Sequence, residues 1–223
     1  MNDVLINVNG GSVQALDILL LLTVLTLLPS LIVMMTSFTR FLMVFSFLRT
    51  AMGTQQNPPN MVLVGMALIL TLFVMTPTID AIQVNALGPY LDGEITQEEF
   101  FDRAQVPFKE YMLRQTEISS LNLYCDMTGV AAPESTDSAE ALALPIRVIL
   151  PSYVTTELKT AFIIGFLLYI PFLLIDIIVS STLMSMGMMM LPPAMISTPF
   201  KILLFILMDG WPKLFSTLVG GIR

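Results

Sequence analysis

The sequence predicts an all-α membrane protein with two long kinked helical hairpins joined by a small helical extramembrane domain. Of its 223 residues, 55% are hydrophobic and 12% are charged, and the mean hydropathy is +0.81. Such values are typical of membrane proteins. Long uncharged runs occur in both halves of the chain, and a polar, acidic segment separates them. This order predicts three parts, namely residues 1–80, 81–150 and 151–223.

The charges and the cysteine count exclude several classes of protein. The net charge of −7 arises mainly in residues 92–157, so it describes one domain. The ten Lys and Arg residues are spread along the chain without a basic cluster, which argues against nucleic-acid binding. With Cys125 as its one cysteine and no histidine, the chain lacks an intramolecular disulfide and the ligands of a structural zinc site. We expect no cofactor.

The first hairpin is predicted from two apolar runs. Residues 18–39 carry no charge, and about 20 such residues cross a bilayer core of about 30 Å. We expect this helix to continue through Arg40 to Leu48, with a kink at Pro29. The polar tract at residues 53–60, GTQQNPPN, predicts the hairpin tip.

The second arm of this hairpin is the uncharged run at residues 61–79, which we expect to end at Pro77 and Asp80.

At the start of the chain, no basic segment precedes the first apolar stretch. We therefore expect no uncleaved signal peptide.

The acidic domain at residues 81–150 is predicted to be helical. Residues 96–121 are expected to form one helix, because Thr96 can cap it and Glu98 and Glu99 favour the positive end of the helix dipole. Residues 129–142, GVAAPESTDSAEAL, are expected to form a loop.

The second hairpin is expected after Pro151. A helix with a capping threonine and Glu157 at its start would run on through Pro171, and a loop rich in Met, Gly and Pro would follow at residues 185–193. The last apolar segment begins near residue 200. Hydropathy leaves open whether it crosses the bilayer, lies at its interface or is buried among partner subunits.

The methionines of this loop are candidates for an apolar seal. Methionine is flexible and polarizable, so a ring of methionines from several subunits could close a channel and deform around a polypeptide. Hydrophobic constrictions also block ions by dewetting. The alternative is that these side chains fill a gap facing lipid or another helix. Gly187 and Pro192 favour a loop over a helix face. The candidates are Met186, Met188, Met189 and Met190.

Four charged residues within apolar segments are further candidates: Arg40, Asp176, Lys201 and Asp209. Such charges are costly in lipid and usually face a bundle interior, a partner or water. Asp176 and Lys201 lie at comparable depth on the two arms of the second hairpin, so they can form an ion pair. Alternatively, each reaches the membrane interface or another subunit.

The few basic residues predict the orientation in the membrane. Arg40 and Arg49 are taken to flank the first tip, and Lys201 follows the second, so the positive-inside tendency places both tips in the cytoplasm. The acidic domain and both termini are then periplasmic.

Enzymatic activity has no residues to carry it. The chain has no histidine for a nucleophile–base pair and no glycine-rich phosphate loop, and neither Asp80 nor Asp209 lies in an intramembrane protease motif.

Phe38, Phe41 and Phe45 recur at helical spacing, which predicts that they pack together on one helix face.

Three blocks of the sequence resemble the FliP family, flagellar export-gate subunits with counterparts in virulence type III secretion systems. Residues 151–166, PSYVTTELKTAFIIGF, and 192–211, PPAMISTPFKILLFILMDGW, are similar to the two family signatures. Residues 38–60 look like the cytoplasmic-tip segment of the family.

The resemblance implies an inner-membrane complex of the flagellar basal body, with five FliP chains, several FliQ and one FliR around a channel for unfolded flagellar proteins. FlhA and FlhB are the further export components it implies. In that family the methionine-rich loop is a gasket, which by motif match falls on Met188, Met189 and Met190. The resemblance also implies tilted helices that bury apolar surface against sister subunits, and a precursor that usually carries a cleaved signal peptide.

Two other functions remain as alternatives to an export pore. One is a subunit of an ion-coupled membrane transporter, in which Asp176 and Lys201 would line a midplane site. The other is a membrane scaffold that anchors export proteins.

Overall fold

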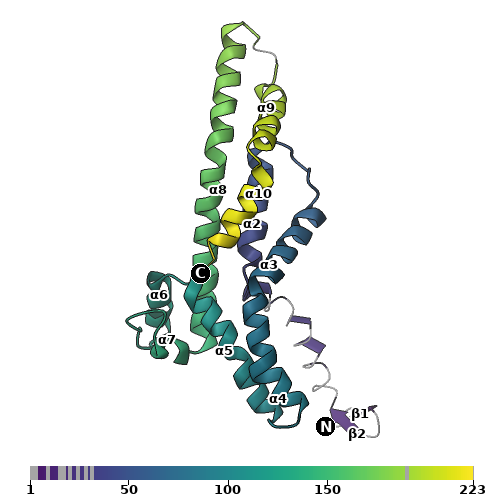
Figure 1. Ribbon diagram of the computed structural model, residues 1–223, viewed down its shortest axis with the longest axis vertical. Coiled ribbons are helices and arrows are strands. Elements are labelled where there is room, and N and C mark those ends of the chain that lie inside the picture. Colours follow the sequence, from purple (N-terminus) through teal and green to yellow (C-terminus); the bar gives the residue numbers. More distant parts are fainter. Residues whose placement is uncertain are drawn as a thin grey trace.

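The computed structural model describes residues 5–8, 11–14, 19, 22–23, 26–27, 30, 33–188 and 191–222. This part of the chain is mostly helical, as the sequence predicted, and helix α8 (Ile146–Ser185) runs along much of its length (Figure 1). The segments Asn60–Leu91 and Ile146–Ser185 are long and apolar enough to cross a membrane. A third candidate span consists of two helices, Pro193–Leu207 and Gly210–Gly220, which are long enough only when they are taken together.

A short β-hairpin precedes the helices and was not predicted. Strands β1 (Leu5–Val8) and β2 (Gly11–Gln14) pair antiparallel, with Leu5 opposite Gln14 and Val8 opposite Gly11. The branched residues of this segment favour extended backbone. The chain is therefore not purely helical.

The first arm of the first hairpin is interrupted. The described residues among 19–34 are helical, but residues 35–37 form turns and a bend before α2 (Phe38–Ala51) begins. The prediction of one helix running on to Leu48 was therefore wrong at this point. The polar pair Thr36 and Ser37 is buried here, and Thr36 Oγ1 accepts a hydrogen bond from the backbone of Phe38. The predicted kink at Pro29 lies outside the described residues.

The second arm is longer than predicted. Helix α3 (Asn60–Ile82) passes through Pro77 and continues as a π-helical turn, η1 (Gln83–Leu87), and as α4 (Gly88–Leu91). The expected end at Pro77 and Asp80 was wrong. The continuation packs against the next helix, α5 (Gln97–Gln115), and this packing outweighs the hydrogen bond that a proline removes.

Between α4 and α8, the acidic segment forms three further helices. In α5 (Gln97–Gln115), the Thr96 hydroxyl accepts from the backbone of Glu99, whose carboxylate accepts from the backbone of Thr96, so the predicted cap is confirmed as a capping box. The predicted helix breaks at Thr116, where the backbone is extended, and α6 (Ile118–Thr128) follows. The predicted loop ends in a short helix, α7 (Ala139–Ala143).

Helix α8 begins before the proline that was expected to precede it. It starts at Ile146 and is unbroken through Pro151 and Pro171. Val148 and Tyr153, on either side of Pro151, are buried in the same core, and this shared face keeps the segment helical. Glu157 therefore lies well inside α8 and not in its first turn, so the predicted start was wrong.

The last apolar segment is two helices. Helices α9 (Pro193–Leu207) and α10 (Gly210–Gly220) meet at an angle of 64°. Asp209 lies between them in the left-handed conformation, with φ +53°. The segment is therefore broken at the position where the sequence carries Met-Asp-Gly.

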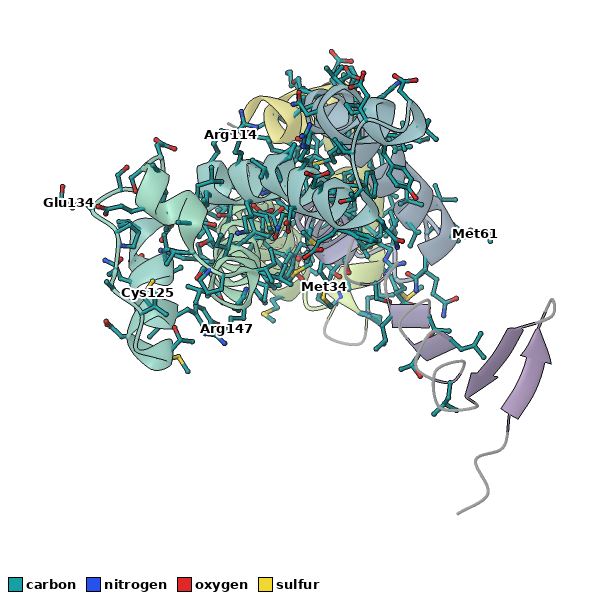
Figure 2. The ribbon with its side chains drawn as sticks, turned by 90° about the horizontal axis from the view of Figure 1, so that it is seen from below. Met34, Met61, Arg114, Cys125, Glu134 and Arg147 are labelled. Atoms are coloured by element: carbon teal, nitrogen blue, oxygen red, sulfur yellow. The ribbon has the colours of Figure 1, made fainter. Side chains whose placement is uncertain are left out.

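Two apolar cores hold the helices together. One joins α2, α3, α8 and α10, and the other joins α5, α6 and α7 to the start of α8 and to Met75 of α3. Phe41 and Phe45 are fully buried in the first core, so the predicted packing role of the Phe set is confirmed for them, and Phe38 packs against the same core. Seen from below, Cys125 and Glu134 mark the α6–α7 lobe on one side, and Met61 of α3 projects on the other (Figure 2).

Candidate functional site

The methionine-rich turn lies at the end of α8, at the top of Figure 1. Gly187 adopts φ +77°, and its backbone N–H donates to Met184 O at 3.0 Å, while that of Met188 donates to Leu183 O at 3.0 Å. These two bonds form a Schellman motif, which ends a helix in a sharp turn. Pro192 and Pro193 then cap and begin α9.

This turn exposes methionine. Met186 is 59% exposed and Met188 is 42% exposed, so both apolar side chains are available to another surface. The other two predicted seal residues, Met189 and Met190, lie outside the described residues. The described part of the turn therefore presents exposed apolar side chains at the end of a long hairpin.

Lys201 and Asp176 form the predicted ion pair, with Nζ to Oδ2 at 2.6 Å. The Ser197 hydroxyl donates to the other carboxylate oxygen of Asp176 at 2.6 Å, and Lys201 Nζ donates to Ala51 O at 3.2 Å. We call these four residues the Lys201 cluster. It ties α8 and α9 to the last residue of α2. Because both oxygens of Asp176 accept hydrogen bonds within the chain, the arrangement suits a structural link better than an ion-carrying site.

Asp209 has a different position from that predicted. Its side chain is exposed at the break between α9 and α10, where the backbone N–H donates to Ile206 O at 3.1 Å. It is not a charge inside an intact apolar helix. Its left-handed backbone is one that Asp tolerates better than most residues, so it fits a helix break.

Arg40 also lies elsewhere than predicted. It is in the first turn of α2, at the opposite end of that helix from the tip, and only Arg49 reaches the tip, where its Nη1 donates to Asn60 Oδ1 at 2.6 Å. The prediction that Arg40 flanks the tip was wrong. The positive-inside argument for the first tip therefore depends on Arg49 alone.

Arg40 pairs with Glu157, a partner that the sequence analysis missed. Arg40 Nε donates to Glu157 Oε2 at 2.7 Å, and Nη2 donates to the second carboxylate oxygen, so the pair is bidentate. Arg40 also donates to Gln115 Oε1 at 3.4 Å and to Gly221 O at 3.3 Å. We call these four residues the Arg40 cluster. Both charged side chains are almost fully buried, at 5% and 1% exposure.

The Arg40 cluster brings together four parts of the chain: α2, α5, α8 and the C-terminal segment. A polar cavity of about 630 Å³ lies beside it and is lined by Arg40, Gln115, Thr156 and Gly221, among others. At its edge, Lys159 Nζ lies 2.6 Å from Glu117 Oε2, and this hydrogen bond lowers the pKa of the Glu117 carboxyl. This end of the molecule is thus held by polar interactions.

A signal for Glu157 was present in the sequence. Charges within apolar segments were treated as candidates, but Glu157 was assigned to the start of a helix and was therefore not considered as a partner for Arg40. Within the described part of the chain, no group of three or more His, Cys, Asp or Glu side chains could hold a metal ion.

Comparison with known proteins decides the family. A profile of the FliP family matches residues 21–218. Two curated relatives called Flagellar biosynthetic protein FliP are similar over most of both chains. That of Bacillus subtilis is 48% identical over 206 residues, covering 92% of this chain and 91% of its own. That of Aquifex aeolicus is 46% identical over 210 residues, covering 94% and 87%.

The chain belongs to the FliP family. The matched region contains the methionine-rich turn, the whole Lys201 cluster and the Arg40 cluster except Gly221. These features therefore lie within the part of the chain that is common to the family. The resemblance read from the three sequence blocks is confirmed. A third relative, Flagellar biosynthetic protein FliP of Caulobacter vibrioides, is 45% identical and covers 98% of this chain and 82% of its own.

Proposed function

We propose that this FliP-family chain is a pore-forming subunit of the flagellar type III export gate, in the bacterial inner membrane at the flagellar basal body. The observation that carries the proposal is the family match over residues 21–218, with relatives called flagellar biosynthetic proteins. The gate passes unfolded flagellar proteins across the membrane.

The exposure of α8 supports assembly with other chains. Only 11% of its most apolar 18-residue window is buried within the chain, so most of this surface needs lipid or a protein partner. At 1.5 Å per residue, its 40 residues extend about 60 Å, roughly twice the bilayer core. Sister copies, arranged as a pentamer, and FliQ and FliR subunits cover the remainder, and FlhA and FlhB join the gate.

The methionine-rich turn is the proposed seal of this pore. It holds Met186 and Met188 exposed at the end of a rigid hairpin, and Met189 and Met190 continue the same run. Unbranched side chains can close against one another and then adapt to any translocating sequence. The tips face the cytoplasm, and the acidic domain and both termini are periplasmic.

Ion conductance tests the seal. Replacement of Met188, Met189 and Met190 by Ala together should raise ion leak through the assembled complex in planar bilayers, because the constriction loses the apolar bulk that excludes water. Met195→Ala is the matched control, since Met195 is 74% exposed but lies in α9 beyond the turn. Unchanged conductance of the triple variant, with the complex still assembled, would overturn the gasket role.

A further inference from the structure

An apolar groove lies where α8, α9 and α10 meet. Its volume is about 350 Å³, within the range of small-molecule sites. Helices α9 and α10 meet at 64°, and the groove lies where their junction faces α8. Leu167 and Met208 line the groove and are 58% and 50% exposed, so it opens onto the outer surface of a candidate membrane segment.

One cation lies at the edge of this groove. Of the described residues that line it, Lys213 is the one with a charge, and the remainder are apolar apart from Thr217 and Gly210. No described carboxylate forms an ion pair with Lys213, although Asp209 is four residues earlier at the helix break. An apolar slot with an unpaired cation at its mouth is complementary to an acyl chain that carries a phosphate.

The neighbouring tryptophan indicates that this end of the groove lies at the level of the lipid headgroups. Trp211 is partly buried among Phe205 and Phe215, with ring centroids at 5.3 and 5.8 Å. Tryptophan and lysine are enriched where helices reach the lipid headgroups, because both have an apolar body and a polar end. The break between α9 and α10 therefore has the residues of a membrane interface.

We infer that this groove binds an anionic phospholipid, with an acyl chain between α8 and α10 and the phosphate at Lys213. A lysine near the membrane surface attracts an anionic headgroup, and the apolar groove accepts the acyl chain. The inference requires only that the chain lies in a membrane. It stands or fails separately from the export function.

The test is native mass spectrometry of the full-length protein in detergent, titrated with phosphatidylglycerol. We expect saturable binding that Lys213→Gln weakens about fivefold, since one basic residue at an anionic surface contributes about that factor. Asp209→Asn is the control, because Asp209 is exposed beside the groove but does not line it. Equal binding to the wild type and to Lys213→Gln would overturn the inference.

A second pair of variants tests the acyl chain. Thr217→Phe places a ring in the groove and should abolish retention, whereas Ser216→Phe, the same change on the adjacent exposed residue that does not line the groove, should leave it intact. The same pair identifies a protein occupant. If the assembled complex retains no phosphatidylglycerol and Thr217→Phe instead separates its subunits, the groove binds a partner helix and the lipid site is wrong.

Discussion

The Arg40 cluster and the Lys201 cluster both tie helices of one chain through an ion pair, but they differ in burial. In the first, both charged side chains are below 6% exposure, and each of the three guanidinium nitrogens donates to a protein acceptor. In the second, the Lys201 side chain is 7% exposed and Asp176 is 35% exposed. The comparison teaches that one pair is completed within the chain, whereas the other keeps a face for solvent, lipid or a neighbour.

The largest effect is expected at the Arg40 cluster. Glu157→Ala leaves a buried guanidinium without its counter-charge, which typically costs about 3–5 kcal/mol in the free energy of unfolding. Thermal unfolding of the detergent-solubilised protein would measure it. The double variant Arg40→Met/Glu157→Leu should recover part of the loss, because no charge then remains buried. A single variant as stable as the wild type would show that the pair does not hold the fold.

Substitutions in the Lys201 cluster should cause a smaller loss of stability, and a second substitution should restore the assembly that the first impairs. Asp176→Asn weakens hydrogen bonds to a charged group, at a cost of about 2 kcal/mol. Asp176→Lys and Lys201→Asp should each impair assembly, measured by the mass of the solubilised complex, and the double charge reversal should restore it.

The control for this rescue is Asp176→Lys combined with Lys213→Asp. Lys213 makes no ion pair with Asp176 in the described structure, so this combination should not restore assembly. Equal rescue by both combinations would mean that net charge, and not the contact, governs assembly.

Between the two clusters, α8 packs closely on α2 at Gly165. A Cβ there would lie 2.6 Å from Phe47 Cγ and 3.0 Å from its Cβ, and the Cβ cannot move without the backbone. We expect Gly165→Ala to cost about 1–3 kcal/mol. In α3, a Cβ at Gly65 meets nothing within 4 Å, so Gly65→Ala should be neutral or stabilising in the same unfolding assay. Equal effects of the two variants would contradict the close packing.

The smallest effect is expected at the exposed pair of Lys159 and Glu117, with side chains 54% and 42% exposed. Lys159→Met should cost less than about 1 kcal/mol. The Lys159 ammonium lowers the pKa of Glu117, so its contribution is present above the ordinary glutamate pKa and is lost as the pH falls through the lowered one. The unfolding temperatures of variant and wild type should therefore converge in acid. A difference that grows in acid would have the wrong sign.

The sequence was informative where the signal is local. The uncharged run at residues 61–79, the polar tip and the Thr96 cap depend on neighbouring residues, and all three predictions are confirmed in the structure. The first uncharged run, residues 18–39, is interrupted at residues 35–37. The helix boundaries predicted at Pro77 and Pro151 were wrong, because packing against other helices decides whether a helix continues through a proline. The Arg40–Glu157 pair joins residues 117 positions apart, and such a contact depends on how the helices are arranged in space.

The candidate sites likewise divide into one that local sequence predicts and one that depends on the arrangement of the helices. The Asp176–Lys201 pair could be predicted because both residues lie on one hairpin, 25 positions apart, at depths that can be counted from its turn. The groove at Lys213 could not, since it depends on the angle between α9 and α10. That angle arises from the left-handed Asp209 and the packing of Trp211 and Phe205, which no periodicity encodes.

Helix α8 connects the two ends of the molecule as one unbroken helix. A single unbroken helix carries Glu157, Asp176 and, at its end, Met186, and the first and last of these are about 40 Å apart along its axis. A tilt of only a few degrees about Glu157 would therefore move the methionine turn by several ångströms. A small displacement at the polar end of α8 would thus become a larger displacement at the methionine turn.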